Sequence, residues 1–63
     1  TNNKDLFWVF ENFFPKSWVK GFYILNIIKY IFRHEQKNGL EDLKKSQAYV
    51  DRLVKFEEGK VSE

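Results

Sequence analysis

Hydrophobic and polar residues recur along most of this chain with the period of an α-helix, and two breaks divide the pattern into three segments. The first break is Phe14-Pro15, because proline disfavours helix at the residue before it. The second is Asn38-Gly39, where glycine can adopt the left-handed conformation that ends a helix. The pattern therefore predicts an all-α protein with helices over about 5–14, from 15–18 to 37 or 38, and from 40 to about 58.

The predicted first helix is strongly aromatic. Its apolar face consists of Leu6, Val9, Phe10 and Phe13, with Phe7 and Phe14 widening it. Asp5 lies in the first turn, where it complements the helix dipole, and Thr1, Asn2 or Asn3 could cap the helix.

The predicted second helix carries two opposite faces. Its apolar arc covers roughly half the circumference of the helix and comprises Ile24, Leu25, Ile27, Ile28, Ile31 and Phe32. On the other side, residues at spacings of three, four and four stack along one line, which we call the polar stripe: Asn26, Lys29, Arg33 and Lys37.

The predicted third helix begins at Leu40, with Asn38 and Glu41 forming a capping box, and Gly59 is expected to end it. Its expected core stripe comprises Leu40, Leu43, Val50, Leu53 and Val54, and its border residues are Asp42, Lys45 and Tyr49. Residues 60–63 are expected to fray. The short second turn predicts an antiparallel hairpin of the second and third helices with the aromatic helix laid across it, so that residues 1–63 form one domain.

The amino-acid composition indicates that the protein self-associates. A chain of 63 residues buries a marginal core, and it has no cysteine for disulfides or thiolate zinc sites. Two Trp, three Tyr and seven Phe exceed what so small a domain can bury, so we expect a homo-oligomer.

Net charge and hydropathy argue against several classes of protein. A net charge of +2 with interspersed signs is not typical of a nucleic-acid binder. The apolar run at 21–28 is about half the length that a secretory or membrane-spanning segment needs. We therefore expect no membrane association.

Few residues have the context of a catalytic or metal site. Three separated glycines cannot form a phosphate-binding loop, and Ser17, Ser46 and His34 lack a triad context. Glu35, Glu41 and Asp42 crowd around one turn, and the second helix offers no further acid for a two-metal centre. No metal site is predicted.

The polar stripe is the better candidate, and two interpretations remain open. Its lysines and arginine could hold a phosphate, with Asp42 orienting Arg33 or Lys29 from across the turn. Alternatively, the stripe could form salt bridges to the third helix, with Asp42 buried enough to need a cation. Tyr30 and Tyr49 could stack on a base or be core residues with an exposed hydroxyl.

A family resemblance rests on these same residues. The segment from Trp18 to Leu53 contains Gly-Phe, Asn, Lys-Tyr, Arg, Lys and Asp-Leu-Lys-Lys followed by Tyr. It resembles a family of small bacteriophage proteins labelled SaV-like, of unknown function, or phage nucleotide kinase. By position, the polar signature of that family falls on Asn26, Lys29, Tyr30, Arg33, Lys37, Asp42, Lys45 and Tyr49.

The resemblance implies a phage early protein in the host bacterial cytoplasm that handles deoxynucleoside monophosphates without a Walker motif. Mg²⁺ would then accompany the nucleotide. Family members begin with a histidine-tyrosine motif ahead of the first helix, and nothing similar appears between Thr1 and Phe10. Either the chain is truncated or it lacks that part of the site, so the resemblance implies nucleotide binding more directly than catalysis.

Two functions are carried forward. The first is nucleotide binding or phosphoryl transfer at the polar stripe, with Asn26, Lys29, Arg33 and Lys37 on the phosphate, between subunits. The second is a non-enzymatic interaction protein that uses an exposed aromatic surface around Trp8 or Phe7 to modulate a host protein.

Overall fold

Three helices and the turns between them make up the described part of the chain. The computed structural model describes residues 6–36 and 38–62, with side chains up to residue 59, and contains helices α1 (Leu6–Phe13), α2 (Lys16–Arg33) and α3 (Leu40–Ser62). Within these ranges no strand is present, which confirms the all-α prediction. None of the described helices is long and apolar enough to cross a membrane.

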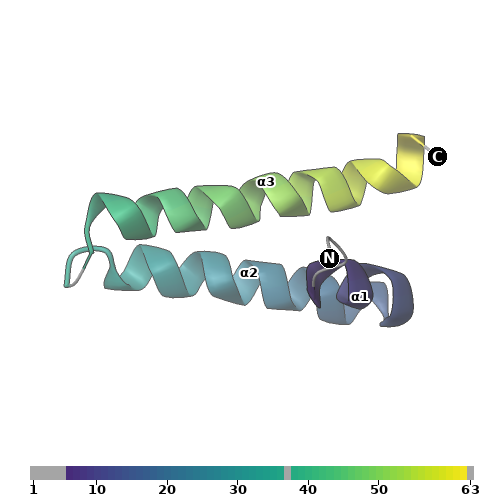
Figure 1. Cartoon of the computed structure of the whole chain (residues 1–63), viewed down its shortest axis with the longest axis horizontal. Helices are drawn as coiled ribbons and strands as arrows, with labels where there is room; N and C mark the ends of the chain where they lie inside the picture. Colours follow the sequence, from purple (N-terminus) through teal and green to yellow (C-terminus); the bar gives the residue numbers. More distant parts are fainter. Residues whose placement is uncertain (1–5, 37, 63) are drawn as a thin grey trace.

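Helices α2 and α3 form an antiparallel hairpin, and α1 lies over the N-terminal part of α2, away from the hairpin turn (Figure 1). Pro15 separates α1 from α2 as predicted. Its carbonyl accepts hydrogen bonds from the backbone N–H groups of Trp18, at 3.0 Å, and Val19, at 3.2 Å. The same proline thus ends one helix and opens the next.

The hairpin turn combines a confirmed prediction and a wrong one. Gly39 has a φ of +47°, the left-handed conformation predicted for it. However, α2 ends at Arg33, before the predicted end at 37 or 38. The N–H groups of His34 and Gln36 donate to carbonyls three residues back, at 3.4 and 3.0 Å, so the chain tightens beyond the α-helical pitch before Asn38 is reached.

Helix α3 is longer than predicted. It continues through Gly59 to Ser62, so Gly59 does not end the helix. An interior glycine costs about 1 kcal/mol relative to alanine, which is too little to stop a helix. The predicted caps at residues 1–3, as well as Asp5 and Lys37, lie outside the described residues.

The core lies between α2 and α3 and is small. Only Val19 and Tyr23 are buried apolar residues among those described, and Asp42 and Ser46 of α3 are buried nearer the hairpin turn. The Ser46 hydroxyl donates to the carbonyl of Ile27 at 3.1 Å, which joins the second turn of α3 to the C-terminal half of α2. The wide apolar arc of α2 therefore contributes little to the core of the single chain: five of its six members are exposed, namely Ile24, Leu25, Ile28, Ile31 and Phe32.

Helix α1 contributes aromatic cover to this core. The Phe7 ring lies about 6 Å from the rings of Phe22, Tyr23 and Tyr49, with centroid distances of 6.1, 6.1 and 5.9 Å. Leu6 and Phe13, which the pattern placed on the apolar face, are 62% and 70% exposed. Helix α1 is laid across the hairpin as predicted, but the side that contacts the hairpin is the one that carries Phe7, not the one that carries Leu6 and Phe13.

Candidate ligand-binding site

An ion pair closes the hairpin turn beside the candidate site. Arg33, the last residue of α2, places Nε 3.3 Å from Oδ2 of Asp42 in the first turn of α3. Asp42 is fully buried, and its Oδ1 has no hydrogen-bond partner among the described residues. The predicted pairing of Asp42 with a polar-stripe cation is confirmed, and Arg33 is the cation.

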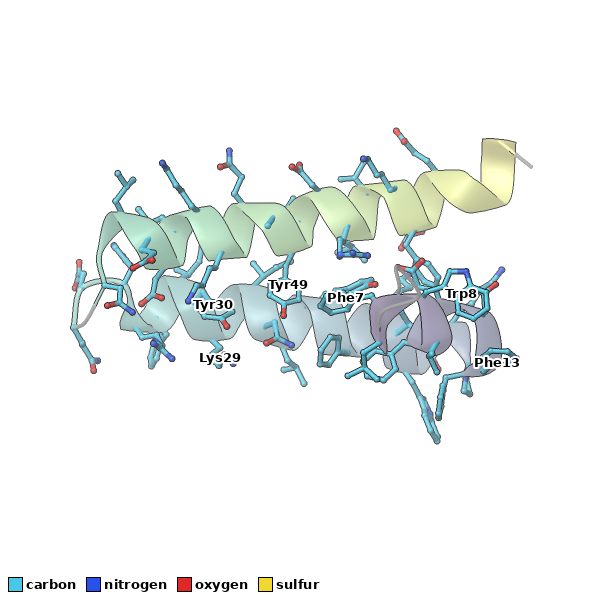
Figure 2. All side chains as sticks on the ribbon, in the orientation of Figure 1. Phe7, Trp8, Phe13, Lys29, Tyr30 and Tyr49 are labelled. Carbon is cyan, nitrogen blue, oxygen red and sulfur yellow. The ribbon has the colours of Figure 1, made fainter. Side chains whose placement is uncertain are left out.

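Two tyrosines stack next to this pair. The rings of Tyr30 on α2 and Tyr49 on α3 are nearly parallel, with centroids 5.9 Å apart and an angle of 18° between them. Figure 2 shows Tyr30, Tyr49 and Phe7 in a row between α2 and α3. Three flat surfaces from three helices therefore follow one another along the hairpin.

Positive charge surrounds the first ring of this row. The Nζ atoms of Lys29 and Lys45 lie 4.7 and 5.5 Å from the Tyr30 centroid, and the Arg33 guanidinium carbon lies 5.6 Å from it. These distances are within the range of cation–π attraction, which holds the cations near the ring. Arg33 has Asp42 as a partner, whereas no ion pair joins Lys29 or Lys45 to a carboxylate in the described ranges.

A shallow cavity opens beside the stacked rings. Its volume is about 310 Å³, and it is lined by Phe7, Tyr30, Lys45, Ala48, Tyr49 and Arg52. The lining combines aromatic faces with two cations and carries no carboxylate. Such a surface suits a planar, negatively charged ligand.

The arginine that lines the cavity, Arg52, is held by α1. The Arg52 guanidinium lies 4.2 Å from the Phe7 ring centroid, and its Nη1 is 3.9 Å from Oε2 of Glu11. The same carboxylate accepts a hydrogen bond from the buried Tyr23 hydroxyl. Helix α1 therefore positions Arg52 at the cavity edge through both a ring and a carboxylate.

Burial also affects the tyrosines of this region. Burial, together with the Glu11 carboxylate, raises the pKa of Tyr23 from 10.0 to about 12, because Arg52 lowers it by less than these two effects raise it. Burial likewise raises the pKa of Tyr49, with the nearby Tyr30 adding to the effect. Both hydroxyls are therefore neutral hydrogen-bonding groups near neutral pH.

The structure gathers most of the predicted site residues but not all of them. Six of them lie together, either around the Tyr30 ring or in the Arg33–Asp42 ion pair beside it: Lys29, Tyr30, Arg33, Asp42, Lys45 and Tyr49. Asn26 instead donates from Nδ2 to the Phe22 carbonyl of its own helix, at 2.9 Å. Lys37 lies outside the described residues.

The sequence pattern missed three members of the cavity, Phe7, Ala48 and Arg52. Arg52 follows Tyr49 by three positions and Lys45 by seven, a spacing that puts all three on one side of a helix. That spacing could have identified Arg52 from the sequence. Phe7 had no such signal, because its position depends on how α1 crosses the hairpin.

The fold and site define a small helical-hairpin protein with an aromatic, cationic cavity. Over residues 3–51, most of its length, the chain matches a family described as proteins of unknown function, DUF3310. The chain belongs to this family. No curated protein and no solved structure matches it significantly.

Proposed function

We propose that this protein binds a nucleotide in the cavity beside Tyr30 and Tyr49, with the base against the aromatic faces and the phosphate near Lys29 and Lys45. The observation that supports the proposal is the group of three cations within 5.6 Å of the Tyr30 ring centre. Two of them, Lys29 and Lys45, have no carboxylate partner among the described residues, so an anion between them would relieve their mutual repulsion.

The aromatic part of the cavity supports a base rather than phosphate alone. Base–aromatic stacking contributes about 1–3 kcal/mol per base. The cavity lining lacks a carboxylate, so any Mg²⁺ would be held by the phosphates of the nucleotide and by water. Asp42 is not available to bind a metal ion near the cavity, because its side chain is fully buried and paired with Arg33.

Binding can be tested with deoxynucleoside mono- and triphosphates by thermal shift and calorimetry. The Lys29→Ala/Lys45→Ala double variant should weaken binding by at least about tenfold, since each charge-assisted contact contributes about 1.5–3 kcal/mol. The Lys16→Ala/Lys55→Ala double variant is the matched control: both lysines are exposed, and the change in net charge is the same. Binding should also weaken with rising salt.

Two outcomes would contradict nucleotide binding here. One is that no nucleotide shifts the melting temperature at millimolar concentration. The other is an equal loss of affinity in the two double variants, which would mean that net charge rather than the cavity attracts the nucleotide.

A finer form of the proposal is phosphoryl transfer from ATP to a deoxynucleoside monophosphate, giving ADP and the diphosphate, in a phage-infected bacterial cell. The resemblance to phage nucleotide kinases supports it, and cations at the cavity would neutralise phosphate charge during transfer. Incubating the protein with ATP, Mg²⁺ and each monophosphate should yield the diphosphate. Binding without any diphosphate would limit the function to nucleotide binding.

A second function is supported by a different surface. Phe10, Phe14, Trp18, Val19 and Phe22 line an apolar cavity of about 230 Å³ where α1 meets α2, and Trp18 is 64% exposed. Exposed aromatic anchors of this kind are typical of protein–protein contacts. If the protein modulates a host protein there, Trp18→Ala should abolish that effect and leave nucleotide affinity unchanged.

A further inference from the structure

Six aliphatic side chains form one exposed face of the hairpin, which we call the aliphatic face. Each is between 38% and 54% exposed: Ile24, Ile28 and Ile31 on α2, and Leu43, Val50 and Val54 on α3. Leu40, which is 66% exposed, extends this face toward the turn. An aliphatic surface spanning two helices is larger than the isolated apolar residues normal for a protein surface.

Both rows of the aliphatic face lie on the same side of the hairpin. An ion pair of 2.8 Å joins Lys20 Nζ to Glu57 Oε2 between the helices. Ile24 lies one turn after Lys20, and Val54 one turn before Glu57, so both continue the surface that carries this pair. On the opposite side, α1 lies over the N-terminal part of α2 (Figure 1), and its Phe7 contacts Phe22.

The spacing within each row is that of a helix-packing seam. On α3, Leu40, Leu43, Gln47, Val50 and Val54 follow at intervals of three, four, three and four, and on α2 Ile24, Ile28 and Ile31 follow at four and three. Alternating steps of three and four place side chains where helices pack knobs-into-holes. The only polar residue among these positions is Gln47, at the centre of its row.

The two rows have matching centres. Ser46 and Ile27 are joined by a hydrogen bond of 3.1 Å, so the next residues, Gln47 and Ile28, lie at about the same level of the hairpin. Leu40 and Val54 are seven positions before and after Gln47, and Ile24 and Ile31 lie four before and three after Ile28. The aliphatic face is therefore nearly symmetric about one line through Gln47 and Ile28.

We propose that a second copy of this chain covers the aliphatic face, with a twofold axis through the level of Gln47 and Ile28, giving an antiparallel four-helix bundle. A twofold interface requires a self-complementary surface, and this symmetry supplies one. Leu40 of each copy meets Val54 of the other, and Ile28 and Gln47 meet their own counterparts. Four-helix bundles pack their helices with this spacing.

Gln47 and the rim charges favour a second copy over an unrelated partner. The Gln47 amide both donates and accepts hydrogen bonds, so on the axis it pairs with its own copy, whereas against a foreign apolar surface it would be left unpaired. Exposed Lys44 and Asp51, three positions before and four after Gln47, bring opposite charges together across the same axis.

The shape of the single chain points the same way. Its radius of gyration is 12.9 Å, compared with about 10.6 Å for a compact domain of this length. A flat hairpin with few fully buried residues has only one layer of helices. Association with a second copy adds a second layer and buries the apolar surface between the two. The nucleotide cavity lies toward α1, so each copy carries its own complete cavity on the outside of the dimer.

The oligomeric state is tested by light scattering during size exclusion at micromolar concentration, where a dimer is expected. Ile28→Asp should convert the dimer to monomers. Leu25→Asp is the matched control, because Leu25 is 67% exposed on the outer side of α2, and this variant should stay dimeric. A monomeric wild-type protein, or equal dissociation in both variants, would overturn the proposal.

Cysteine cross-linking tests the arrangement without relying on a destabilised variant, since the chain has no native cysteine. Gln47→Cys should oxidise rapidly to a disulfide-linked dimer, whereas Glu41→Cys, on the far side of α3, should not. Leu40→Cys mixed with Val54→Cys should cross-link faster than either variant alone. Equal rates for Gln47→Cys and Glu41→Cys, or Leu40→Cys linking as fast to itself as to Val54→Cys, would overturn the antiparallel pairing.

Discussion

Arg33 Nε lies 3.3 Å from Asp42 Oδ2, and this contact joins the last residue of α2 to the first turn of α3. The two partners are not equally exposed: the Asp42 side chain is fully buried, whereas that of Arg33 is 37% exposed. The carboxylate therefore depends on the arginine for compensation, while the arginine can still reach water.

This asymmetry predicts that removing the arginine costs more than removing the carboxylate. Arg33→Ala leaves a buried charge unpaired and should lower the free energy of unfolding by about 3 kcal/mol or more. Asp42→Ala should lower it by about 2 kcal/mol, because the arginine left behind is partly hydrated. Urea unfolding at one protein concentration measures both.

Glu41→Ala is the control for that pair, since Glu41 is the exposed neighbour of Asp42. It should change the free energy of unfolding by less than about 0.5 kcal/mol. If Asp42→Ala costs as little as Glu41→Ala, Asp42 is an ordinary surface acid near a helix start, and the ion pair does not stabilise the turn.

The second prediction concerns two glycines in different backbone conformations, whose substitution by alanine should change the stability of the protein in opposite directions. Gly39 has a φ of +47°, so Gly39→Ala should destabilise the protein by about 1 kcal/mol even though its nearest neighbour, the His34 carbonyl oxygen, is 3.8 Å from the new Cβ. Gly59 lies inside α3 with nothing within 4 Å, so Gly59→Ala should stabilise by about 0.5–1 kcal/mol. Thermal unfolding of both variants checks this, and a shift in the same direction would contradict it.

The elements of the fold could be predicted from the sequence because their signals are local. The Pro15 ring fixes φ, and Gly39 can adopt a positive φ because it has no Cβ, so the breaks at both positions follow from residue type. The Arg33–Asp42 pair was also foreseeable, since a short turn brings the two helix ends together and a buried acid needs a cation.

The buried face of α2 was not predictable, because this helix is apolar on more than one side. The isoleucines outnumber Val19 and Tyr23, yet the latter are the buried ones. What selects Tyr23 is tertiary: Phe7 and Glu11 of α1 meet its ring and its hydroxyl. For the same reason, Phe7 could not be assigned to the candidate site from its own segment.

The position of Phe7 leads to a third prediction. Its ring contacts those of Phe22, Tyr23 and Tyr49, so Phe7→Ala should cost about 2–3 kcal/mol, somewhat below the loss expected for a fully buried ring. Phe13→Ala in the same helix should cost less than about 1 kcal/mol, because Phe13 is 70% exposed. Chemical denaturation compares the two, and equal losses would mean that α1 packs through a different face.

The last prediction concerns pH and the buried hydroxyl of Tyr23. Its pKa is raised from 10.0 to about 12 in the folded state, first by burial and then by Glu11. Below pH 10 the tyrosine is protonated in both states and adds no pH dependence. Between pH 10 and 12 the unfolded chain loses this proton first, so the free energy of unfolding falls by up to about 1.4 kcal/mol per pH unit. Tyr23→Phe lacks this proton, so the stability advantage of the wild type over the variant should shrink as the pH rises over that range. Lysines and the other tyrosines titrate in both proteins, and taking the difference removes their contribution. Urea unfolding at pH 9, 10 and 11 measures the difference, and a constant value would show that Tyr23 ionises as easily in the folded protein as in the unfolded chain.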